Sequence, residues 1–435
     1  MLNEKKSSRL IQNPYFLFFP FFLLYAILIL LRSKSILFGD EGRYLFFAKN
    51  LTHGYYWHPG SSIGLANGPG YPILLAPFVA LNVPLIYMKL INAVLQYLSI
   101  VFLFKSLKEI VSYKKALIIS LCWACYYHVL DFIHLLYSEN LSIFLVSLML
   151  FFLVKTFREE SLRAKKYLYL SGLTMGYLVL TKVIFGYVML CMVVGSILLW
   201  IIKRQSLSYR KGVVILLIAL ATTLPYLLYT YNLTGKIFYW TATSGDNLYW
   251  MSSPYKDEYG STFSFSDFEI EKLDKDVTSS YGKDSIKSHH WEDYEKIKKY
   301  EDMMAKDSIL KEASIRNIRS HPGKFIQNCL SNVGRILFNS PYSYTFQRPS
   351  NLLRLPFNGI IVVLMLFSLA PTIINWKEII YPIRFLVVFI FIYLGGSVLG
   401  SAETRMFTVG VPVLLFWVTY IIQKTIRINL QFIKH

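Results

Sequence analysis

The chain has 435 residues, of which 54% are hydrophobic and 16% charged, whereas about a quarter are charged in a typical soluble domain. Its apolar residues are gathered in long blocks, which excludes an ordinary soluble protein and indicates a polytopic membrane protein. The net charge of +19 does not favour nucleic-acid binding, because the basic residues crowd alternate loops between the apolar blocks, as a topology signal does.

A helix needs about 20 apolar residues to cross the bilayer core. On this basis we predict an all-α polytopic membrane protein with about ten transmembrane helices. One long apolar run is interrupted only by Lys182, and we divide it there into two helices. The predicted spans are residues 14–32, 85–104, 115–131, 138–154, 167–181, 183–202, 212–231, 352–374, 382–400 and 406–423.

Ten spans place every lysine- and arginine-rich loop on the side of the N-terminus, which predicts cytoplasmic N- and C-termini. We divide the chain into an N-terminal transmembrane catalytic module (1–231), a long extracytoplasmic loop with helices (232–351) and C-terminal transmembrane helices (352–435). The end of the long loop has helical periodicity, broken at "SHPGKF". The first extracytoplasmic loop is residues 33–84, and residues 132–137 and 400–405 lie on the same side.

The first extracytoplasmic loop begins with "FGDEGRYLF", which contains Asp40, Glu41 and Arg43. If a helix starts after Gly39, Asp40 and Arg43 lie one turn apart on one face. Asp40 could then be an N-cap with Arg43 as its partner, or both could be functional. His58 follows in a polar and aromatic stretch and could join Asp40 at a divalent metal, although loop histidines are more often hydrogen-bond donors.

Three more charged residues stand at the ends of predicted spans on this same side: Glu139, Lys182 and Arg405. Ionisable groups at membrane depth are unfavourable and usually face protein or water, so each is a functional candidate besides a snorkelling residue. Fixed cations suit a lipid phosphate, and a carboxylate can act as a general base toward a hydroxyl. Nearby carboxylates also stabilise the oxocarbenium character of an anomeric carbon.

Several of these segments, taken in order, resemble a known family. "GDEGRYLFFAKNLTHGYYW", "NGPGYPILLAPF", "LLYSENLSIFLVSLML", "SGLTMGYLVLTKVIFGYVML" and "ETRMFTVGVPVLLFW" resemble the GT-C membrane glycosyltransferases, within them the dolichyl-phosphate-mannose protein mannosyltransferase-like group (glycosyltransferase family 39), with the lipid A aminoarabinose transferases as relatives. The resemblance implies a GT-C-type bundle whose extracytoplasmic loops carry the active site.

The resemblance implies an inverting glycosyltransferase that uses a polyprenyl-phosphate-linked sugar and an extracytoplasmic lipid, glycan or protein acceptor, in a bacterial inner membrane. It implies Asp40, Glu41 and Glu139 as catalytic residues, with Asp40 as the base. The aminoarabinose-type relatives carry a Glu-Lys pair where this chain has Asn67 and Gly68. The residues expected at the donor phosphate are Arg43, Lys182 and Arg405, and those expected to bind substrate are His58, Asn67, Tyr71 and Asn247.

Two other functions use the same cations. A flippase of lipid-linked sugars would need a phosphate site but no base, and a carboxylate at Asp40 would repel its anion. Paired repeats with broken helices are typical of many transporters, and none is evident in the sequence. A polysaccharide polymerase would use a lipid-pyrophosphate oligosaccharide, and the single Asp40-Glu41 motif near the first span argues mildly against it. The sequence predicts no cofactor apart from the alternative of a divalent metal ion at Asp40 and His58.

Overall fold

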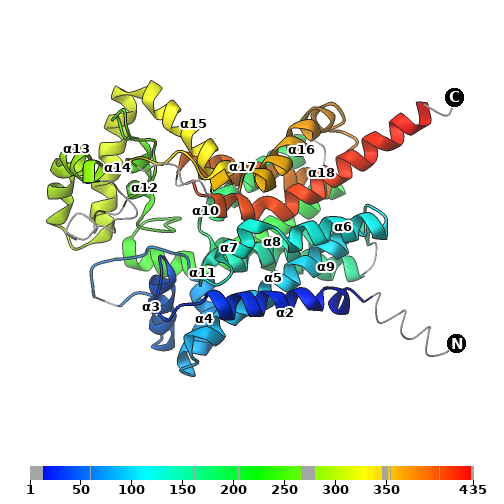
Figure 1. Ribbon diagram of the computed structural model, residues 1–435, viewed down its shortest axis with the longest axis horizontal. Coiled ribbons are helices and arrows are strands. Elements are labelled where there is room, and N and C mark those ends of the chain that lie inside the picture. Colours follow the sequence, from blue (N-terminus) through cyan, green and yellow to red (C-terminus); the bar gives the residue numbers. More distant parts are fainter. Residues whose placement is uncertain are drawn as a thin grey trace.

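The structure is a computed structural model that describes residues 13–58, 60–159, 162–202, 206–263, 265, 280–344, 351–352, 354–400 and 402–432. These residues form α-helices without a β-strand, which confirms the predicted fold class. Figure 1 shows long helices lying side by side, with α12 (Ser244–Met251), α13 (Ser280–Lys298) and α14 (Met303–Ser320) gathered at one end. Helix α2 (Pro14–Arg32) begins, and α18 (Thr404–Phe432) ends, at the opposite end.

Among the described residues, eight helices are long and apolar enough to cross a membrane, and they match eight of the ten predicted spans. The chain is therefore an integral multi-pass membrane protein. Besides α2 and α18, these helices are α5 (Leu85–Leu107), α8 (Ser138–Arg158), α10 (Ile184–Ile202), α11 (Leu207–Thr234), α16 (Leu355–Ile374) and α17 (Tyr381–Leu399).

The other two predicted spans are helical but differ from an ordinary span. The span predicted at 115–131 is broken into α6 (Tyr113–Ala124) and α7 (Tyr127–Phe132), because Tyr126 has an extended backbone with φ −68° and ψ 114°. The span predicted at 167–181 is α9 (Leu162–Thr181), whose first turns carry basic residues. Since α9 ends at Thr181 and α10 begins at Ile184, the predicted break at Lys182 is confirmed.

Small residues let two of the buried helices approach closely. A Cβ atom on Gly172 would lie 2.6 Å from Ile218 Cβ, and one on Gly176 would lie 2.5 Å from Thr222 Cβ. These two glycines are one turn apart on α9, so they form the small-residue face on which α11 packs, as expected between helices in a membrane. This packing holds the end of α9, and therefore Lys182, in a fixed place.

The segments between the long apolar helices are also helical. Helices α3 (Glu41–Thr52) and α4 (Gly70–Ala80) lie in the loop predicted at 33–84, and α15 (Pro322–Phe338) follows α14 directly. The interruption predicted at "SHPGKF" is confirmed, because α14 ends at Ser320 and α15 begins at Pro322. Helices α12, α13 and α14 share a small hydrophobic core of their own, which consists of Tyr249, Trp250, Tyr294, Ile297, Leu310 and Ala313.

Candidate functional site

Asp40 stands immediately before α3, on a sharp turn that requires a glycine. Gly39 has φ +58°, and a Cβ atom on it would lie 2.6 Å from the Tyr137 hydroxyl oxygen. Asp40 occupies the N-cap position, but its side chain makes no capping hydrogen bond. Instead its carboxylate pairs with Arg43, one turn further along α3, as the spacing predicted. The Asp40 carboxylate is therefore available for interactions outside its own helix.

Arg405 brings the distant charged residues together. Arg405 lies in the first turn of α18, and its Nη1 lies 3.0 Å from Asp40 Oδ2. Its Nε lies 2.5 Å from Glu403 Oε2 and 3.6 Å from Glu139 Oε1. The Arg405 Cζ atom also lies 4.9 Å from the centroid of the Tyr137 ring, so a cation–π contact helps to hold the guanidinium in place. One arginine thus bridges three carboxylates from three parts of the chain.

Lys182 completes the cluster from the end of α9. Its Nζ donates to Glu139 Oε1 at 2.7 Å, and the Glu139 side chain is 2% exposed. Ser138 Oγ lies 3.5 Å from Glu139 Oε2 and accepts a hydrogen bond from the Tyr44 hydroxyl at 2.9 Å. The structure therefore joins Asp40, Arg43, Glu139, Lys182 and Arg405 in one network of ion pairs. We call these five residues together with Glu403 the charged centre.

Glu41 is predicted to be catalytic, but the structure turns its side chain away from Asp40. Its carboxylate is fully buried, 3.0 Å from the equally buried Lys89 Nζ on α5. It also accepts hydrogen bonds from the backbone N–H groups of Phe38 at 2.8 Å and Leu136 at 2.9 Å. Glu41 thus contacts Lys89 and two backbone N–H groups, and it anchors the loop predicted at 33–84 on α5. This geometry favours a structural role for Glu41, and its catalytic role remains a prediction.

The four residues predicted to bind substrate lie in different surroundings. Tyr71 is 1% exposed, and its hydroxyl donates to Asn92 at 3.4 Å, so it belongs to the core. Asn67 donates to the Tyr44 hydroxyl at 3.5 Å, close to the charged centre. His58 is exposed beside Tyr55, and Asn247 is half-buried on α12. Of the four, Asn67 and Tyr71 both contact Tyr44, whose hydroxyl is hydrogen-bonded to Ser138.

The "NGPG" sequence has a steric role next to Lys182. A Cβ atom on Gly68 would lie 2.2 Å from the Leu180 carbonyl oxygen, and one on Gly70 would lie 2.6 Å from the Thr181 backbone nitrogen. Both glycines are needed because the backbone of the loop lies directly on the end of α9.

We expect Gly70→Ala to displace this end of α9 and lower turnover at least about tenfold, because a misplacement of about 1 Å can reduce turnover strongly. A turnover within a factor of two of wild type would contradict this steric role.

The predicted metal alternative at Asp40 and His58 does not fit the donor set. Among the described residues, no three His, Cys, Asp or Glu side chains are grouped so that they could hold a metal ion. Asp40 is instead engaged by Arg43 and Arg405. We therefore derive no step through a metal.

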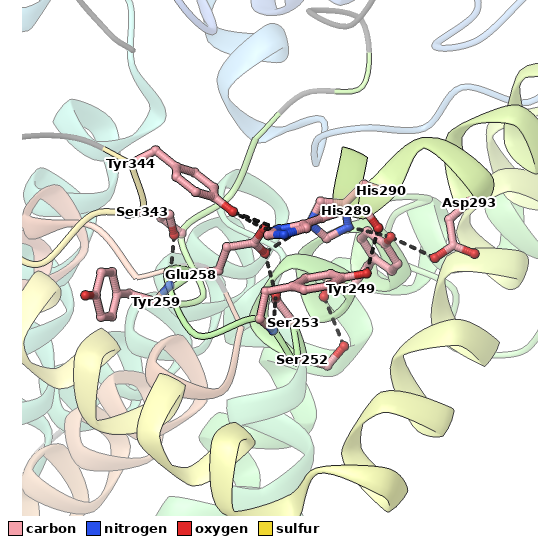
Figure 2. A network of polar contacts seen from close by, with 12 residues as sticks. Tyr249, Ser252, Ser253, Glu258, Tyr259, His289, His290, Asp293, Ser343 and Tyr344 are labelled. Atoms are coloured by element: carbon pink, nitrogen blue, oxygen red, sulfur yellow. Dashed lines mark hydrogen bonds and ion pairs between the residues drawn. The ribbon is translucent and has the colours of Figure 1, made fainter. Parts of the chain in front are cut away.

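A second polar network joins residues of α12 and α13 to Glu258 and Tyr344 (Figure 2). Glu258 is at its middle and accepts from Tyr344 at 2.7 Å and from Ser253. His290 Nε2 lies 3.0 Å from both Glu258 carboxylate oxygens, and its Nδ1 lies 2.7 Å from the Tyr249 hydroxyl. Burial opposes ionisation of Glu258, but the hydrogen bond and charge of His290, with the hydroxyl donors, outweigh it and lower its pKa to about 2.

This shift predicts that the stability of the part formed by α12, α13 and α14 depends on pH. Because the folded pKa lies below the usual value near 4.5, the contribution of Glu258 is complete above that value and is lost as the pH falls toward 2. We expect Glu258→Gln to lower the free energy of unfolding by about 2–4 kcal/mol at pH 7, and by progressively less below pH 4.5. Thermal unfolding across pH measures this, with the 86%-exposed Glu292→Gln on α13 as control. Equal curves for the two variants would contradict the prediction.

Sequence reasoning missed several residues that shape the centre. Lys89 lies inside a predicted span, where one lysine indicates a snorkelling residue and gives no sign of a buried partner on α3. Tyr137 directly precedes the predicted span at 138–154, and its position beside Glu139 was the available signal for it. Glu403, in "GSAETR", can be grouped from the sequence with the other carboxylates of this side, but the sequence assigns it no role.

Comparison with known proteins supports the resemblance. Residues 66–229 match the family model described as Dolichyl-phosphate-mannose-protein mannosyltransferase. Among curated proteins, none matches the sequence. Solved structures that match include two of the oligosaccharyltransferase from Archaeoglobus fulgidus, in one case named AglB, and one of ArnT from Cupriavidus metallidurans.

The structural matches are distant. AglB with an inhibitory peptide and a dolichol-phosphate has a TM-score of 0.47 and 14% identity over 94% of this chain and 50% of that one. The Archaeoglobus fulgidus oligosaccharyltransferase tethered to an acceptor peptide has a TM-score of 0.42 and 12% identity, and the match covers 94% of this chain and 49% of that one. ArnT in the apo state has a TM-score of 0.42 and 11% identity, and the match covers 93% of this chain and 76% of that one. This chain thus spans about half the length of the oligosaccharyltransferase chains. The predicted family resemblance is confirmed for residues 66–229, which match the dolichyl-phosphate-mannose-protein mannosyltransferase family.

Proposed function

We propose that the chain is an inverting glycosyltransferase that moves a sugar from a polyprenyl-phosphate donor to a hydroxyl acceptor on the extracytoplasmic side of a bacterial cell membrane. The observation that carries the proposal is the contact of Asp40 with both Arg43 and Arg405, because it places a carboxylate base directly beside two cations for the departing phosphate. The family model that matches residues 66–229 is described by a lipid-phosphate-linked sugar, dolichyl-phosphate-mannose, and this supports a donor of that class.

In the proposed reaction, Asp40 accepts the proton of the acceptor hydroxyl. The hydroxyl oxygen then forms a bond to the anomeric carbon while the bond from that carbon to the phosphate oxygen breaks. The negative charge that grows on the phosphate is neutralised by Arg43 and Arg405, and Lys182 supplies a third positive charge in the same network. The electron pair of the broken bond stays on the lipid phosphate, which leaves.

Asp40 is a better base than Glu139 in this geometry. The Asp40 side chain is 20% exposed, so a hydroxyl can approach it, whereas Glu139 is 2% exposed and held by Lys182 and Arg405. A base must come within hydrogen-bond distance of the proton that it removes. We therefore assign Glu139 to positioning Lys182 and Arg405, and Asp40 to the proton transfer.

The test uses purified wild type and Asp40→Asn in detergent with native lipid, and radiolabelled polyprenyl-phosphate sugars with a membrane acceptor extract. We expect wild type to release free lipid phosphate and Asp40→Asn to do so at least about 100-fold more slowly, as when a general base is removed. The exposed Asp257→Asn is the control. If both proteins bind donor equally and neither releases lipid phosphate, the transferase proposal fails and transport of lipid-linked sugars takes its place.

A further inference from the structure

A cavity of about 410 Å³ lies among α12, α13 and α14, outside the charged centre. Its volume falls within the range of about 300–1,000 Å³ that is usual for small-molecule sites. The charged and aromatic side chains that line it come from all three helices and from the segment between α12 and α13. They are Asp246, Phe265, Tyr294, Lys298, Lys306 and Asp307.

The two carboxylates of this cavity are close enough to act on each other. Asp307 accepts hydrogen bonds from the Gly245 backbone N–H at 2.5 Å and the Ser244 hydroxyl at 3.2 Å, while Asp246 accepts from Trp250 Nε1 at 3.2 Å. Burial, with the charge of Asp307, raises the pKa of Asp246 to about 6. Burial also raises the pKa of Asp307. Ionising the buried Asp246 at neutral pH therefore disfavours folding, and because this carboxylate lines a cavity, the arrangement points to a role in binding.

The rest of the lining suits a neutral, hydroxyl-rich ligand. Phe265 and Tyr294 stack with ring centroids 6.1 Å apart and an interplanar angle of 18°, and they form an apolar wall. Lys298 and Lys306 balance the charges of the two carboxylates, so the lining has no net charge that would select an ion. Carboxylates accept hydrogen bonds from hydroxyl groups, and an aromatic wall packs against the C–H face of a sugar ring.

Hydrogen bonds connect the segment that lines the cavity to the first extramembrane loop, which carries Asn67. Thr241 Oγ1 donates to the Leu65 and Ala66 carbonyls at 3.0 Å, and the Ala242 N–H donates to Leu65 at 2.6 Å. The next residue along that loop is Asn67, which contacts Tyr44 on α3. The charge of Arg43, the partner of Asp40, reaches Asp246 and counteracts part of the effect of burial on its pKa. The segment that lines the cavity at Ala242 is therefore hydrogen-bonded to the loop that carries Asn67, and Asp246 senses the charge of Arg43 on α3.

We propose that this cavity is the acceptor site and that the acceptor is a saccharide, with hydroxyls held by Asp246 and Asp307 and one sugar face on Phe265 and Tyr294. This inference rests on the proposed function. Because the acceptor would enter beside Arg43, its free hydroxyl could reach Asp40 without displacing the donor from the cations of the charged centre.

The first experiment measures binding without turnover. Saturation-transfer difference NMR on full-length Asp40→Asn in detergent uses maltose, cellobiose and N,N′-diacetylchitobiose as probes, with a Ser/Thr-containing pentapeptide for comparison. We expect a disaccharide signal that Asp246→Asn in the same background weakens about tenfold and the 77%-exposed Glu312→Gln on α14 leaves unchanged. No signal from any disaccharide, or a signal from the pentapeptide alone, would overturn the saccharide assignment even if the transferase proposal holds.

The second experiment separates binding from structural damage. In wild type with a saccharide acceptor, we expect Asp246→Asn to raise KM for the acceptor about tenfold with a smaller change in kcat, and to raise the thermal unfolding temperature at pH 7.5. A merely structural aspartate would instead lower that temperature. An unchanged KM, or a lower unfolding temperature, would remove Asp246 from the acceptor site. If wild type shows no transfer at all while the NMR signal persists, the failure lies in the proposed reaction.

Discussion

Arg405→Ala is expected to reduce the release of lipid phosphate by about 10²–10³-fold, because this guanidinium contacts Asp40, Glu139 and Glu403 together. Without it, three carboxylates face one another across the charged centre, and the departing phosphate loses its central cation. Arg405→Lys keeps a positive charge but has no planar fork to reach three partners at once. We expect its turnover to lie between those of wild type and Arg405→Ala.

Turnover of purified variants, measured as released lipid phosphate at saturating donor, tests this expectation. Arg316→Ala on α14 is a suitable control, since its side chain is 59% exposed and lies far along the chain from the charged centre. Thermal unfolding of each variant separates a local effect from misfolding. Turnover of Arg405→Ala within threefold of wild type would remove this arginine from the mechanism.

Glu41→Gln is expected to destabilise the protein by about 3–5 kcal/mol, because it leaves the Lys89 ammonium buried without its partner. Removing both charges, in Glu41→Gln combined with Lys89→Met, should restore most of this stability, since a buried pair replaced by neutral groups of similar volume is often tolerated. The lysine side chain is 1% exposed and the glutamate 0%, so water cannot compensate for the missing charge.

The double variant also distinguishes anchoring from catalysis. If Glu41 only fixes the loop, the double variant should regain turnover together with thermal stability. If it takes part in the chemistry, the double variant should be stable and still inactive. Unfolding temperature and released lipid phosphate, measured on the same preparations, decide between the two. A single Glu41→Gln variant as stable as wild type would contradict the anchoring role.

Much of the fold follows from local sequence, because hydrophobic length sets the spans and basic residues mark their ends. The break at Lys182 follows from the same argument. The split of the span predicted at 115–131 does not, since the extended backbone at Tyr126 sits in a run that remains apolar throughout. Continuous hydropathy carries no information on where such a helix is interrupted.

The members of the charged centre were largely predictable, but of its pairings only that of Asp40 with Arg43 was. Asp40, Glu139 and Arg405 could be grouped because charged side chains at span ends on one side of a membrane avoid lipid and face protein or water on that side. Which carboxylate meets which cation depends on how α3, α5 and α8 pack, and this explains why Glu41 was assigned to chemistry although it pairs with Lys89. The Glu258 and His290 pair, far apart in the loop sequence, gave no local signal at all.

The charged centre contains three acidic and three basic side chains, so their charges cancel at short range. Such a group produces little electric potential beyond a Debye length of about 10 Å, and it cannot steer an anionic lipid from a distance. Encounter with the donor is then governed by lateral diffusion in the bilayer. The second-order rate constant should accordingly change little with ionic strength, unlike that of an enzyme whose site attracts its substrate electrostatically.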